Sequence, residues 1–310
     1  MTIRTLAILL VPGFTLTLAA EPQKPLPPAP AGVEIIENVE YGTGGGHALH
    51  ADIARPLETP KDLMPAVLTI HGGGWAGGSH RGYLPFGLVK QGYFIAAIEY
   101  RLSGEAPWPA QIEDCKAAVR WLRANAAKYH VDPNRIGCMG HSAGGHLVAC
   151  LGTLQDLPEL EGKGGNEGVS SKVQAVVDEA GPTDFTPAAA PAVGELPKDH
   201  KDNPGLVKLL GGTYAEKNIA WETASPALHV AKGDPPFLVV HGELDHLVPI
   251  AQAERIVGAL KKANVPVEFI RVKNGGHGLR ADKPSDPPAD PDSKALEQSI
   301  LSFFNKNLKP

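Results

Sequence analysis

The chain has 310 residues, of which 43% are hydrophobic and 20% charged, and its formal net charge at pH 7 is -5. This balance is that of a globular protein with one large α/β domain or two small ones. The negative net charge argues against a nucleic-acid partner, which would need a basic surface.

The first 20 residues are predicted to be a secretory signal peptide. Arg4 supplies the positive start, residues 6–18 are mostly apolar, and small residues precede a cut near Ala19 or Ala20. A Pro-Gly pair interrupts the apolar run, which is therefore too short and too broken for stable membrane insertion. We expect a secreted or periplasmic protein, and an uncleaved N-terminal helix is the alternative.

A Pro-rich linker is expected over residues 21–32, followed by one domain over residues 33–310. The domain begins with residues 33–54, which are interpreted as two strands around the glycine-rich turn 42–46. Apolar and polar residues alternate there, as in a half-exposed antiparallel pair. Residues 66–70 are apolar throughout, as a central parallel strand should be.

Residues 94–98 form the next apolar run, and residues 111–129 follow with apolar residues at helical spacing. Asp114, Arg120 and Arg123 would lie off or beside this apolar stripe. They are interpreted as solvated residues or as members of structural ion pairs.

The stretch Gly140-His141-Ser142-Ala143-Gly144 has the G-x-S-x-G pattern of a nucleophile elbow. A turn at 131–134 is expected to lead into the short apolar strand 136–139 before it, and residues 145–151 can continue as a helix. In so tight a connection, only small residues fit beside the serine. The turn would lift the Ser142 hydroxyl over the sheet edge, where a helix N-terminus favours developing negative charge.

Strands and helices keep alternating along the rest of the chain. This alternation predicts an α/β fold with a mostly parallel sheet and helices on both faces. The remaining expected strands are 173–177, 236–241 and 267–272, and the remaining expected helices are 250–263 and 296–308.

Two polar stretches break this alternation. Residues 183–228 are rich in Pro, Lys and Asp and have weak helical periodicity, so they form either a small lid over the site or a long surface insertion. Residues 281–292 are rich in Pro and Asp and are expected to be a mobile loop.

Three consecutive glycines end the predicted strand 66–70, in the motif His71-Gly72-Gly73-Gly74-Trp75. Glycines at that position let backbone N–H groups turn toward a bound oxygen without obstruction by side chains. That is the physical requirement of an oxyanion hole. A flexible turn is the alternative interpretation, and His71 is expected to be structural because it belongs to the strand end.

A serine nucleophile needs a base, and the base needs an orienting carboxylate. His277 lies in the glycine loop Asn274-Gly275-Gly276-His277-Gly278, directly after the last predicted strand. Asp245 lies in the loop after the preceding strand, before a helix that a proline starts. Ser142, Asp245 and His277 therefore come in the chain order of an α/β-hydrolase, at one edge of the sheet.

The motifs together carry a family resemblance over most of residues 33–310. The chain resembles α/β-hydrolase carboxylesterases of the hormone-sensitive-lipase-like kind, and within them the bacterial feruloyl and acetylxylan esterase-like branch. The stretches that carry it are His71-Gly72-Gly73-Gly74-Trp75, Tyr100-Arg101-Leu102, Gly140-His141-Ser142-Ala143-Gly144-Gly145, His241-Gly242-Glu243-Leu244-Asp245 and Gly276-His277-Gly278.

The resemblance implies a role for each site residue. Ser142 would attack an ester carbonyl, His277 would take its proton and later protonate the leaving alcohol, and Asp245 would hold the imidazole. A water would then hydrolyse the acyl-enzyme. No cofactor or metal is implied, and no Cys/His cluster has the spacing of a zinc site. The expected oxyanion hole is formed by the backbone N–H groups of Gly73, Gly74 and Ala143.

Other charged and histidine residues near these motifs are given structural interpretations. Glu243 is interpreted as loop surface and His246 as a loop residue. His141 is expected to point away from the site. Asp178 and Glu179 would end a strand at the same edge, where they either line the pocket or offer an alternative acid.

The remaining polar and aromatic candidates are expected to be packed. His146 lies one turn into the helix after the elbow and is interpreted as a packed or capped side chain. Trp75 and Trp108 could stack on a sugar or aryl ring, but core or rim packing is the preferred interpretation. Cys115, Cys138 and Cys150 lie in apolar patterns typical of buried free thiols, and the alternative in an exported protein is a Cys138–Cys150 or Cys115–Cys138 disulfide.

The sequence therefore predicts an exported serine esterase. Its substrate would be a small-molecule or polysaccharide ester, with acetyl or hydroxycinnamoyl groups of plant polysaccharide as the first hypothesis. The alternatives are a general carboxylesterase or lipase for short acyl esters, a serine peptidase, and a binding module on an inactive hydrolase scaffold. The peptidase hypothesis is weaker because such relatives usually carry an additional propeller domain.

Overall fold

The computed structural model describes residues 25–26, 28–192 and 204–309. The expected signal peptide over residues 1–20 lies outside the described residues, as does part of the expected linker. None of the described helices combines the length and the apolar character needed to cross a bilayer.

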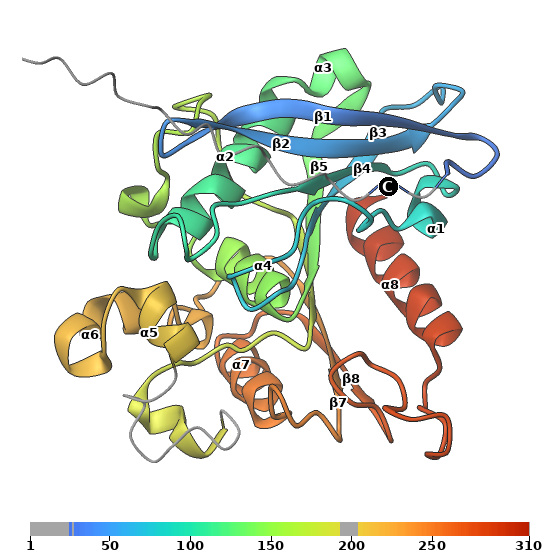
Figure 1. Cartoon of the computed structure of the whole chain (residues 1–310). Coiled ribbons are helices and arrows are strands. Elements are labelled where there is room, and N and C mark those ends of the chain that lie inside the picture. Colours follow the sequence, from blue (N-terminus) through green and yellow to red (C-terminus); the bar gives the residue numbers. More distant parts are fainter. Residues whose placement is uncertain (1–24, 27, 193–203, 310) are drawn as a thin grey trace, which may run out of the picture.

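One eight-stranded sheet forms the centre of the molecule (Figure 1). Its strands are β1 (Val33–Gly44), β2 (His47–Pro56), β3 (Met64–Ile70), β4 (Phe94–Ile98), β5 (Val131–His141), β6 (Ala175–Glu179), β7 (Phe237–Gly242) and β8 (Val267–Val272). They lie in the order β1-β2-β4-β3-β5-β6-β7-β8. The β1–β2 and β2–β4 pairs are antiparallel, and every pair from β4 to β8 is parallel.

Helices cover both faces of this sheet, as the sequence predicted. They are α1 (Phe86–Val89), α2 (Ala110–Ala124), α3 (Ala126–Tyr129), α4 (Ala143–Thr153), α5 (Pro204–Leu210), α6 (Tyr214–Thr223), α7 (Ala251–Lys262) and α8 (Ser293–Leu308). Figure 1 shows α8 and α1 on one side of the sheet and α2, α4 and α7 on the other. Short 3₁₀ turns lie at Pro158–Leu160, Pro187–Ala192 and Pro226–Leu228.

The two faces of the sheet bury separate hydrophobic clusters. In β4, Phe94, Ala96 and Ile98 pack toward the face of α2 and α4, whereas Ile95 and Ala97 pack toward the face of α8. A strand places alternate side chains on opposite faces, so a strand covered on both sides must be apolar at every position. This is why the runs 66–70 and 94–98 could be recognised as central strands.

Two local predictions differ from the structure. The helix expected over 111–129 is two helices, α2 and α3, separated by Asn125 at φ -100° and ψ 11°. The Asn125 side chain donates to the Trp121 carbonyl at 2.9 Å, a local bond that competes with helix continuation. The turn expected at 131–134 lies inside β5, whose register with β3 shifts there.

The described part of the 183–228 segment contains α5, α6 and two of the 3₁₀ turns. In Figure 1 these elements lie beside α4 and α7. Leu209 and Trp221 are fully buried in the larger cluster, and the Trp108 N–H donates to the Leu209 carbonyl at 2.6 Å. The segment is thus packed into the body of the domain, while residues 193–203 lie outside the described residues.

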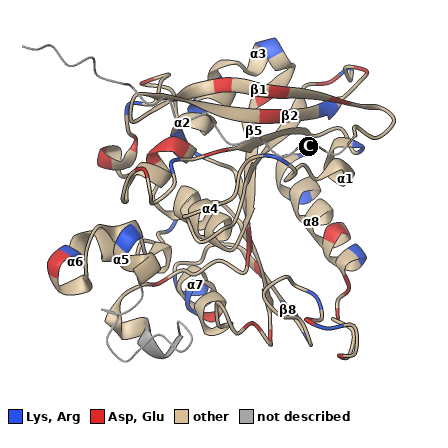
Figure 2. Cartoon of the chain, in the orientation of Figure 1, with Lys and Arg blue, Asp and Glu red and all other residues tan. Residues whose placement is uncertain are grey.

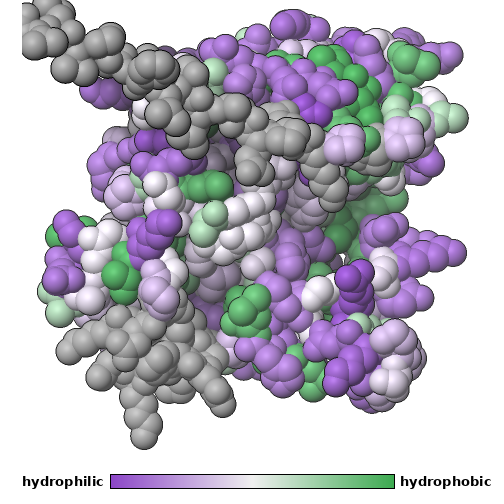
Figure 3. Space-filling view, in the orientation of Figure 1, coloured by the Kyte–Doolittle hydropathy of each residue, from purple (hydrophilic) through white to green (hydrophobic). Residues whose placement is uncertain are grey.

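Charged and apolar residues are interspersed on the face of the molecule that Figures 2 and 3 show. Figure 2 shows both signs of charge on α6 and on α8. Figure 3 shows a mainly hydrophilic surface on the face in view, with hydrophobic residues in small separate patches.

Candidate active site

Ser142 occupies a strained turn between β5 and α4. Its φ of 58° and ψ of -119° lie in a region that residues with a side chain rarely adopt. A Cβ at Gly140 would lie 2.3 Å from the Gly144 carbonyl oxygen, and a Cβ at Gly144 would lie 2.0 Å from the Ile70 carbonyl oxygen. The turn therefore needs glycine at both positions, which is the physical content of the elbow pattern.

The three residues predicted as nucleophile, base and acid come together at the carboxyl edge of the sheet. His277 Nε2 lies 2.9 Å from Ser142 Oγ, and His277 Nδ1 lies 2.7 Å from Asp245 Oδ2. Ser142 follows β5, Asp245 follows β7 and His277 follows β8. Because β5, β7 and β8 run in the same direction, residues 135 positions apart along the chain form one linear hydrogen-bonded series.

The Asp245 carboxylate is buried but fully hydrogen-bonded. Its Oδ1 accepts the backbone N–H groups of Leu247 at 2.9 Å and Val248 at 2.8 Å, and its Oδ2 faces His277 and His241. Burial acts to raise the pKa of Asp245. The hydrogen bonds from His241, His277 and Val248 outweigh burial and hold the pKa of Asp245 well below its usual range. The carboxylate is therefore ionised whenever the imidazole needs a partner.

The glycine loop after β3 lies beside the elbow. Gly73 and Gly74 have φ of 117° and 59°, and a Cβ at Gly73 would lie 2.3 Å from the Gly77 carbonyl oxygen. Ala143 begins α4. In the described parts of the chain, no backbone hydrogen bond uses the N–H of Gly73, Gly74 or Ala143, so these donors are available to a substrate oxygen.

The segment after β4 holds this glycine loop at both ends. The Tyr100 ring stacks on the His71 ring with centroids 4.4 Å apart, and the Tyr100 hydroxyl donates to the His71 carbonyl at 3.2 Å. The Ser103 N–H donates to the Trp75 carbonyl at 2.7 Å. His71 is thus structural, as predicted. Sequence reasoning missed these holding contacts, although Tyr100 belongs to a motif that carried the family resemblance.

His141 does not point away from the site, and that prediction is wrong. Its Nε2–H donates to the His277 backbone carbonyl at 2.8 Å, and the two imidazole rings lie 4.9 Å apart. Burial lowers the pKa of His141, which favours the neutral form of the ring. The elbow residue before the nucleophile therefore positions the loop that carries the base, and no local sequence pattern indicates such a contact.

The two acids at the end of β6 have other partners than the imidazole. Asp178 Oδ1 accepts the Gly181 N–H at 3.0 Å, and Glu179 Oε2 accepts the Tyr83 hydroxyl at 2.9 Å. Burial raises the pKa of Asp178 to about 6 and the pKa of Glu179 to about 7. Neither carboxylate is hydrogen-bonded to His277, which is bonded to Asp245 instead.

Most of the remaining charged candidates follow their structural interpretations, but Arg123 forms none of the ion pairs found among the described residues and donates to the carbonyls of Pro133 and Lys172 instead. Glu243 pairs with Arg271 at the surface, and His246 is exposed. Asp114 pairs with Arg101, and Arg120 pairs with Glu161. Because Asp114 and Arg120 are buried, the ion-pair interpretation holds for them and the solvated one does not.

His146 and the two tryptophans form a packed cluster behind the elbow. His146 is fully buried, accepts the Trp75 indole N–H at 3.2 Å and donates to the Ala224 carbonyl at 2.7 Å. Burial lowers the pKa of His146 to about 4. Trp75 and Trp108 contact its ring edge-on or tilted, so core packing accounts for both tryptophans.

The cysteines and potential metal ligands complete the description of the site. Cys115, Cys138 and Cys150 are buried free thiols. Within the described residues, no group of three or more His, Cys, Asp or Glu side chains is arranged to hold a metal ion.

Two family models match the chain. The BD-FAE model matches residues 51–260, and the dienelactone hydrolase family model matches residues 214–308. Between them they include all three residues of the hydrogen-bonded series.

Individual relatives are esterases by name. The chain is 31% identical to Esterase LipC of Mycobacterium tuberculosis over 250 residues, which cover 78% of this chain and 59% of LipC. The chain spans about three fifths of the length of these curated mycobacterial relatives.

The similar solved structures include carbohydrate-directed hydrolases and an esterase from Thermogutta terrifontis. A truncated carbohydrate esterase from gut microbiota shares 31% identity and a TM-score of 0.76, over 90% of this chain and 98% of that one. An acetyl ester-xyloside bifunctional hydrolase from Caldicellulosiruptor lactoaceticus shares 25% identity and a TM-score of 0.65, over 84% of this chain and 88% of that one.

Proposed function

The chain belongs to the BD-FAE family and carries a carboxylic ester hydrolase domain of the α/β-hydrolase fold, and from that premise we propose that the whole protein is an exported serine esterase that removes acetyl or feruloyl groups from plant polysaccharide. The observation that carries the proposal is the position of His277, within hydrogen-bonding distance of both Ser142 Oγ and Asp245 Oδ2.

In the proposed reaction, Ser142 is the nucleophile. His277 Nε2 accepts the hydroxyl proton as Oγ attacks the ester carbonyl, and the Nδ1–H of the resulting imidazolium donates to Asp245. The ionised Asp245 stabilises the imidazolium and fixes the ring orientation. The protein thus lowers the barrier by holding the base in place before the substrate arrives.

The developing oxyanion would be stabilised by backbone donors. The N–H groups of Gly73, Gly74 and Ala143 lie at the glycine loop and at the start of α4, where the helix dipole also favours negative charge. Collapse of the tetrahedral intermediate expels the alcohol, which takes its proton from His277. Water then attacks the acyl-enzyme with His277 again as base, which releases the acid and restores Ser142.

Two lines of support favour a polysaccharide substrate. Similar solved structures include one titled as a carbohydrate esterase and one titled as an acetyl ester-xyloside bifunctional hydrolase. A polymer cannot enter the cell, so the signal-like stretch over residues 1–20 agrees with such a substrate. Export therefore belongs to the proposal together with the substrate class.

The test is a matched panel of esters hydrolysed by the wild-type protein and by Ser142→Ala. The panel contains acetylated xylan, methyl ferulate and p-nitrophenyl esters from acetate to octanoate. We expect Ser142→Ala to lose activity by several powers of ten, to a residue of about 10³-fold over water, because only the nucleophile is removed. Circular dichroism and the melting temperature check that the variant is folded.

The outcomes separate the alternatives. Hydrolysis of acetylated xylan or ferulate that disappears in Ser142→Ala supports the proposal. Wild-type activity in Ser142→Ala would refute the elbow assignment. The absence of any ester hydrolysis by the wild-type protein would revive the peptidase and binding-module hypotheses.

A general short-acyl carboxylesterase is the second candidate. Leu244 and Leu247 flank Asp245 and its neighbour in the acid loop, and their side chains are 49% and 68% exposed. Exposed leucines this close to the triad could contact an apolar acyl or alcohol group. Hydrolysis of p-nitrophenyl butyrate without hydrolysis of any sugar ester would favour this candidate.

A further inference from the structure

Three adjoining hollows lie along the carboxyl edge of the sheet, beginning beside the nucleophile. The first, the site hollow, has a volume of about 420 Å³. A Cβ placed on Gly72 in its wall would lie 3.3 Å from the Ser142 Cβ, so Gly72 packs against the reacting serine and the hollow lies beside it. Its lining includes His71, Gly72, Gly78, Ser79, Tyr83 and His141.

The second, the middle hollow, continues from the first. It has a volume of about 240 Å³ and shares the residues His71, Gly78 and Ser79 with the site hollow. Gly78 and Ser79 are exposed, so they form an open ridge between the two hollows. On its far side the middle hollow is lined by Tyr100, Arg101 and Glu105, from the segment after β4.

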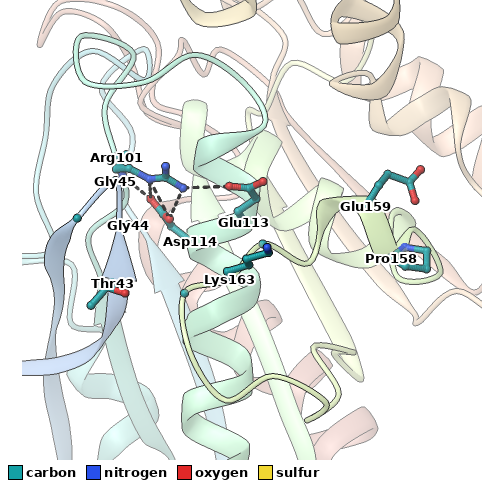
Figure 4. Close-up of a pocket in the computed structure, with 12 residues that line it drawn as sticks. Thr43, Gly44, Gly45, Arg101, Glu113, Asp114, Pro158, Glu159 and Lys163 are labelled. Carbon is teal, nitrogen blue, oxygen red and sulfur yellow. Dashed lines mark hydrogen bonds and ion pairs between the residues drawn. The ribbon is translucent and has the colours of Figure 1, made fainter.

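The third, the distal hollow, is the largest and is shown in Figure 4. It has a volume of about 650 Å³ and shares Arg101 with the middle hollow. One wall is the hairpin between β1 and β2, with Thr43, and the opposite wall is the loop that carries Glu159 and Lys163. The Thr43 N–H donates to the Gly164 carbonyl at 3.1 Å and so joins the two walls.

Arg101, which both hollows share, is held in a fixed position. Its Nε and Nη2 lie 2.9 Å and 2.8 Å from the two carboxylate oxygens of Asp114, and its Nη2 lies 3.1 Å from Glu113. Figure 4 shows the guanidinium between these two acids. A planar cation clamped in this way presents a rigid polar surface that needs little ordering when a ligand binds.

The lining of the distal hollow selects against apolar ligands. Among the described residues that line it, Pro158 is the only one with an apolar side chain, and the rest are glycine, charged residues and Thr43. Gly45 and Gly46 are exposed and leave the hairpin wall without side chains, so a sugar ring can approach the backbone closely. The exposed hydroxyl, ammonium and carboxylate groups around this wall can form hydrogen bonds with a ligand that carries hydroxyl groups along its whole length.

We propose that the site, middle and distal hollows together form one trough that binds the sugar chain on which the ester is carried. The acylated unit would lie at Ser142, and further pyranose units would follow over the Gly78–Ser79 ridge and past Arg101 into the distal hollow. The substrate class is then an acylated oligosaccharide or polysaccharide, bound through several units, and not an acylated monosaccharide. This inference rests on the proposed function and specifies the substrate of the same site.

The test compares chain length at constant chemistry. We would measure kcat/KM per acetyl group on acetylated xylose and on short and long acetylated xylo-oligosaccharides, with p-nitrophenyl acetate as a substrate too small for the trough. The variants are Thr43→Trp and Lys163→Trp, which fill the distal hollow from opposite walls. The matched control is Thr59→Trp, at another exposed threonine, in the loop before β3 at the opposite edge of the sheet.

In the wild-type protein, we expect kcat/KM to rise by about fivefold or more from the monosaccharide to the long chain, the effect of about one added hydrogen bond. Either trough variant should remove this rise, mainly through KM, and leave p-nitrophenyl acetate and acetylated xylose unchanged. Thr59→Trp should behave as the wild-type protein on every substrate. Binding of long xylo-oligosaccharide to Ser142→Ala, measured by calorimetry, should weaken by the same factor when Thr43→Trp is added.

Three results would overturn the trough. They are equal kcat/KM on short and long chains in the wild-type protein, an unchanged rise in both Thr43→Trp and Lys163→Trp, and a loss of the rise in Thr59→Trp as well. If p-nitrophenyl acetate is hydrolysed but no acetylated sugar is, the proposed polysaccharide substrate fails and the trough fails with it. If acetylated sugars are hydrolysed without any dependence on chain length, only the trough fails.

Discussion

The loop after β7 and the end of β6 both bring carboxylates to the same edge of the sheet, yet their electrostatic situations are opposite. Asp245 accepts two backbone N–H groups and faces two imidazoles, and its pKa lies well below its usual range despite burial. Glu179 accepts one tyrosine hydroxyl, and burial raises its pKa to about 7. Burial acts to raise both pKa values, so the difference comes from the donors around Asp245 and from the charge of Asp178, which raises the pKa of Glu179 further.

This difference decides which acid can serve a histidine base. A carboxylate that is ionised at neutral pH and already aligned stabilises an imidazolium without reorganisation. A carboxyl group with a pKa near 7 is partly protonated in the same pH range and has no comparable effect. Proximity to the sheet edge is therefore insufficient, and the surrounding donors assign the role.

The largest effect is expected from Asp245→Asn, which replaces the ionised carboxylate by a neutral amide. The side-chain amide can still accept the N–H groups of Leu247 and Val248 through Oδ1, so the loop should keep its conformation. It loses the charge that stabilises the imidazolium and the acceptor that fixes the tautomer of His277. We expect kcat on p-nitrophenyl acetate to fall about 10⁴-fold. Steady-state kinetics measure this loss. Active-site titration of the wild-type protein gives the concentration of active enzyme to which its kcat is referred.

The matched control is Glu243→Gln, the same change of acid to amide in the same loop. Glu243 pairs with Arg271 at the surface, and exposed pairs contribute little to stability or geometry. Its kcat should stay within about twofold of the wild-type value. If Asp245→Asn kept more than a tenth of the wild-type kcat, the orienting acid would have to be sought elsewhere, with Asp178 and Glu179 as the first candidates.

The sequence allowed the fold to be predicted more completely than the contacts within the site. The α/β fold class was confirmed, because short apolar runs such as 66–70 and 94–98 are typical of strands buried on both faces. Chain order was enough to place Ser142, Asp245 and His277 at one edge, and the structure puts them within hydrogen-bonding distance. Their catalytic roles, the oxyanion donors and the export signal stay predictions.

The sequence did not allow the contacts between loops to be predicted. The ring of His141 meets the His277 loop, and Tyr100 holds His71, because separate crossovers end next to each other in space. The break at Asn125 depends on one side-chain bond that competes with the helix, and the apolar stripe continues across it. Such features depend on side-chain orientation, and periodicity carries no information about orientation.

The raised pKa values of the two acids at the end of β6 should make the stability of the fold depend on pH. A carboxyl group whose pKa is higher in the folded state binds more protons there, so stability is greatest below the unfolded pKa and falls as pH rises through the folded one. For Glu179 that window runs from the ordinary value of 4.5 to about 7. The free energy of unfolding, from urea denaturation, should therefore fall between pH 5 and pH 8, by up to about 3 kcal/mol from Glu179 alone.

Glu179→Gln tests that assignment. The amide does not ionise, so the decline between pH 5 and pH 8 should become shallower, whereas kcat at pH 8 should change by less than about threefold because the side chain is not bonded to His277. Asp245 gives the opposite sign, since its lowered pKa stabilises the folded state above the ordinary value and loses effect only in strong acid. An unchanged decline in Glu179→Gln would show that Asp178 or another group is responsible.

The smallest expected effect is that of Tyr83→Phe, which removes the hydrogen bond from the Tyr83 hydroxyl to Glu179. The Tyr83 hydroxyl donates to Oε2 at 2.9 Å and lowers the pKa of Glu179 against the larger effect of burial. Without it, Glu179 has fewer donors still, so its pKa should rise further and the loss of stability should extend to higher pH. The variant should be about 1 kcal/mol less stable than the wild-type protein at pH 8, where the lost bond is to a charged acceptor, and closer to it at pH 5. Urea denaturation at the two pH values measures both terms, and the double variant Tyr83→Phe with Glu179→Gln should show no further pH dependence from this pair. An equal destabilisation at pH 5 and pH 8 would mean that Tyr83 acts through packing in the α8-side core, where its ring lies, and not through the charge of Glu179.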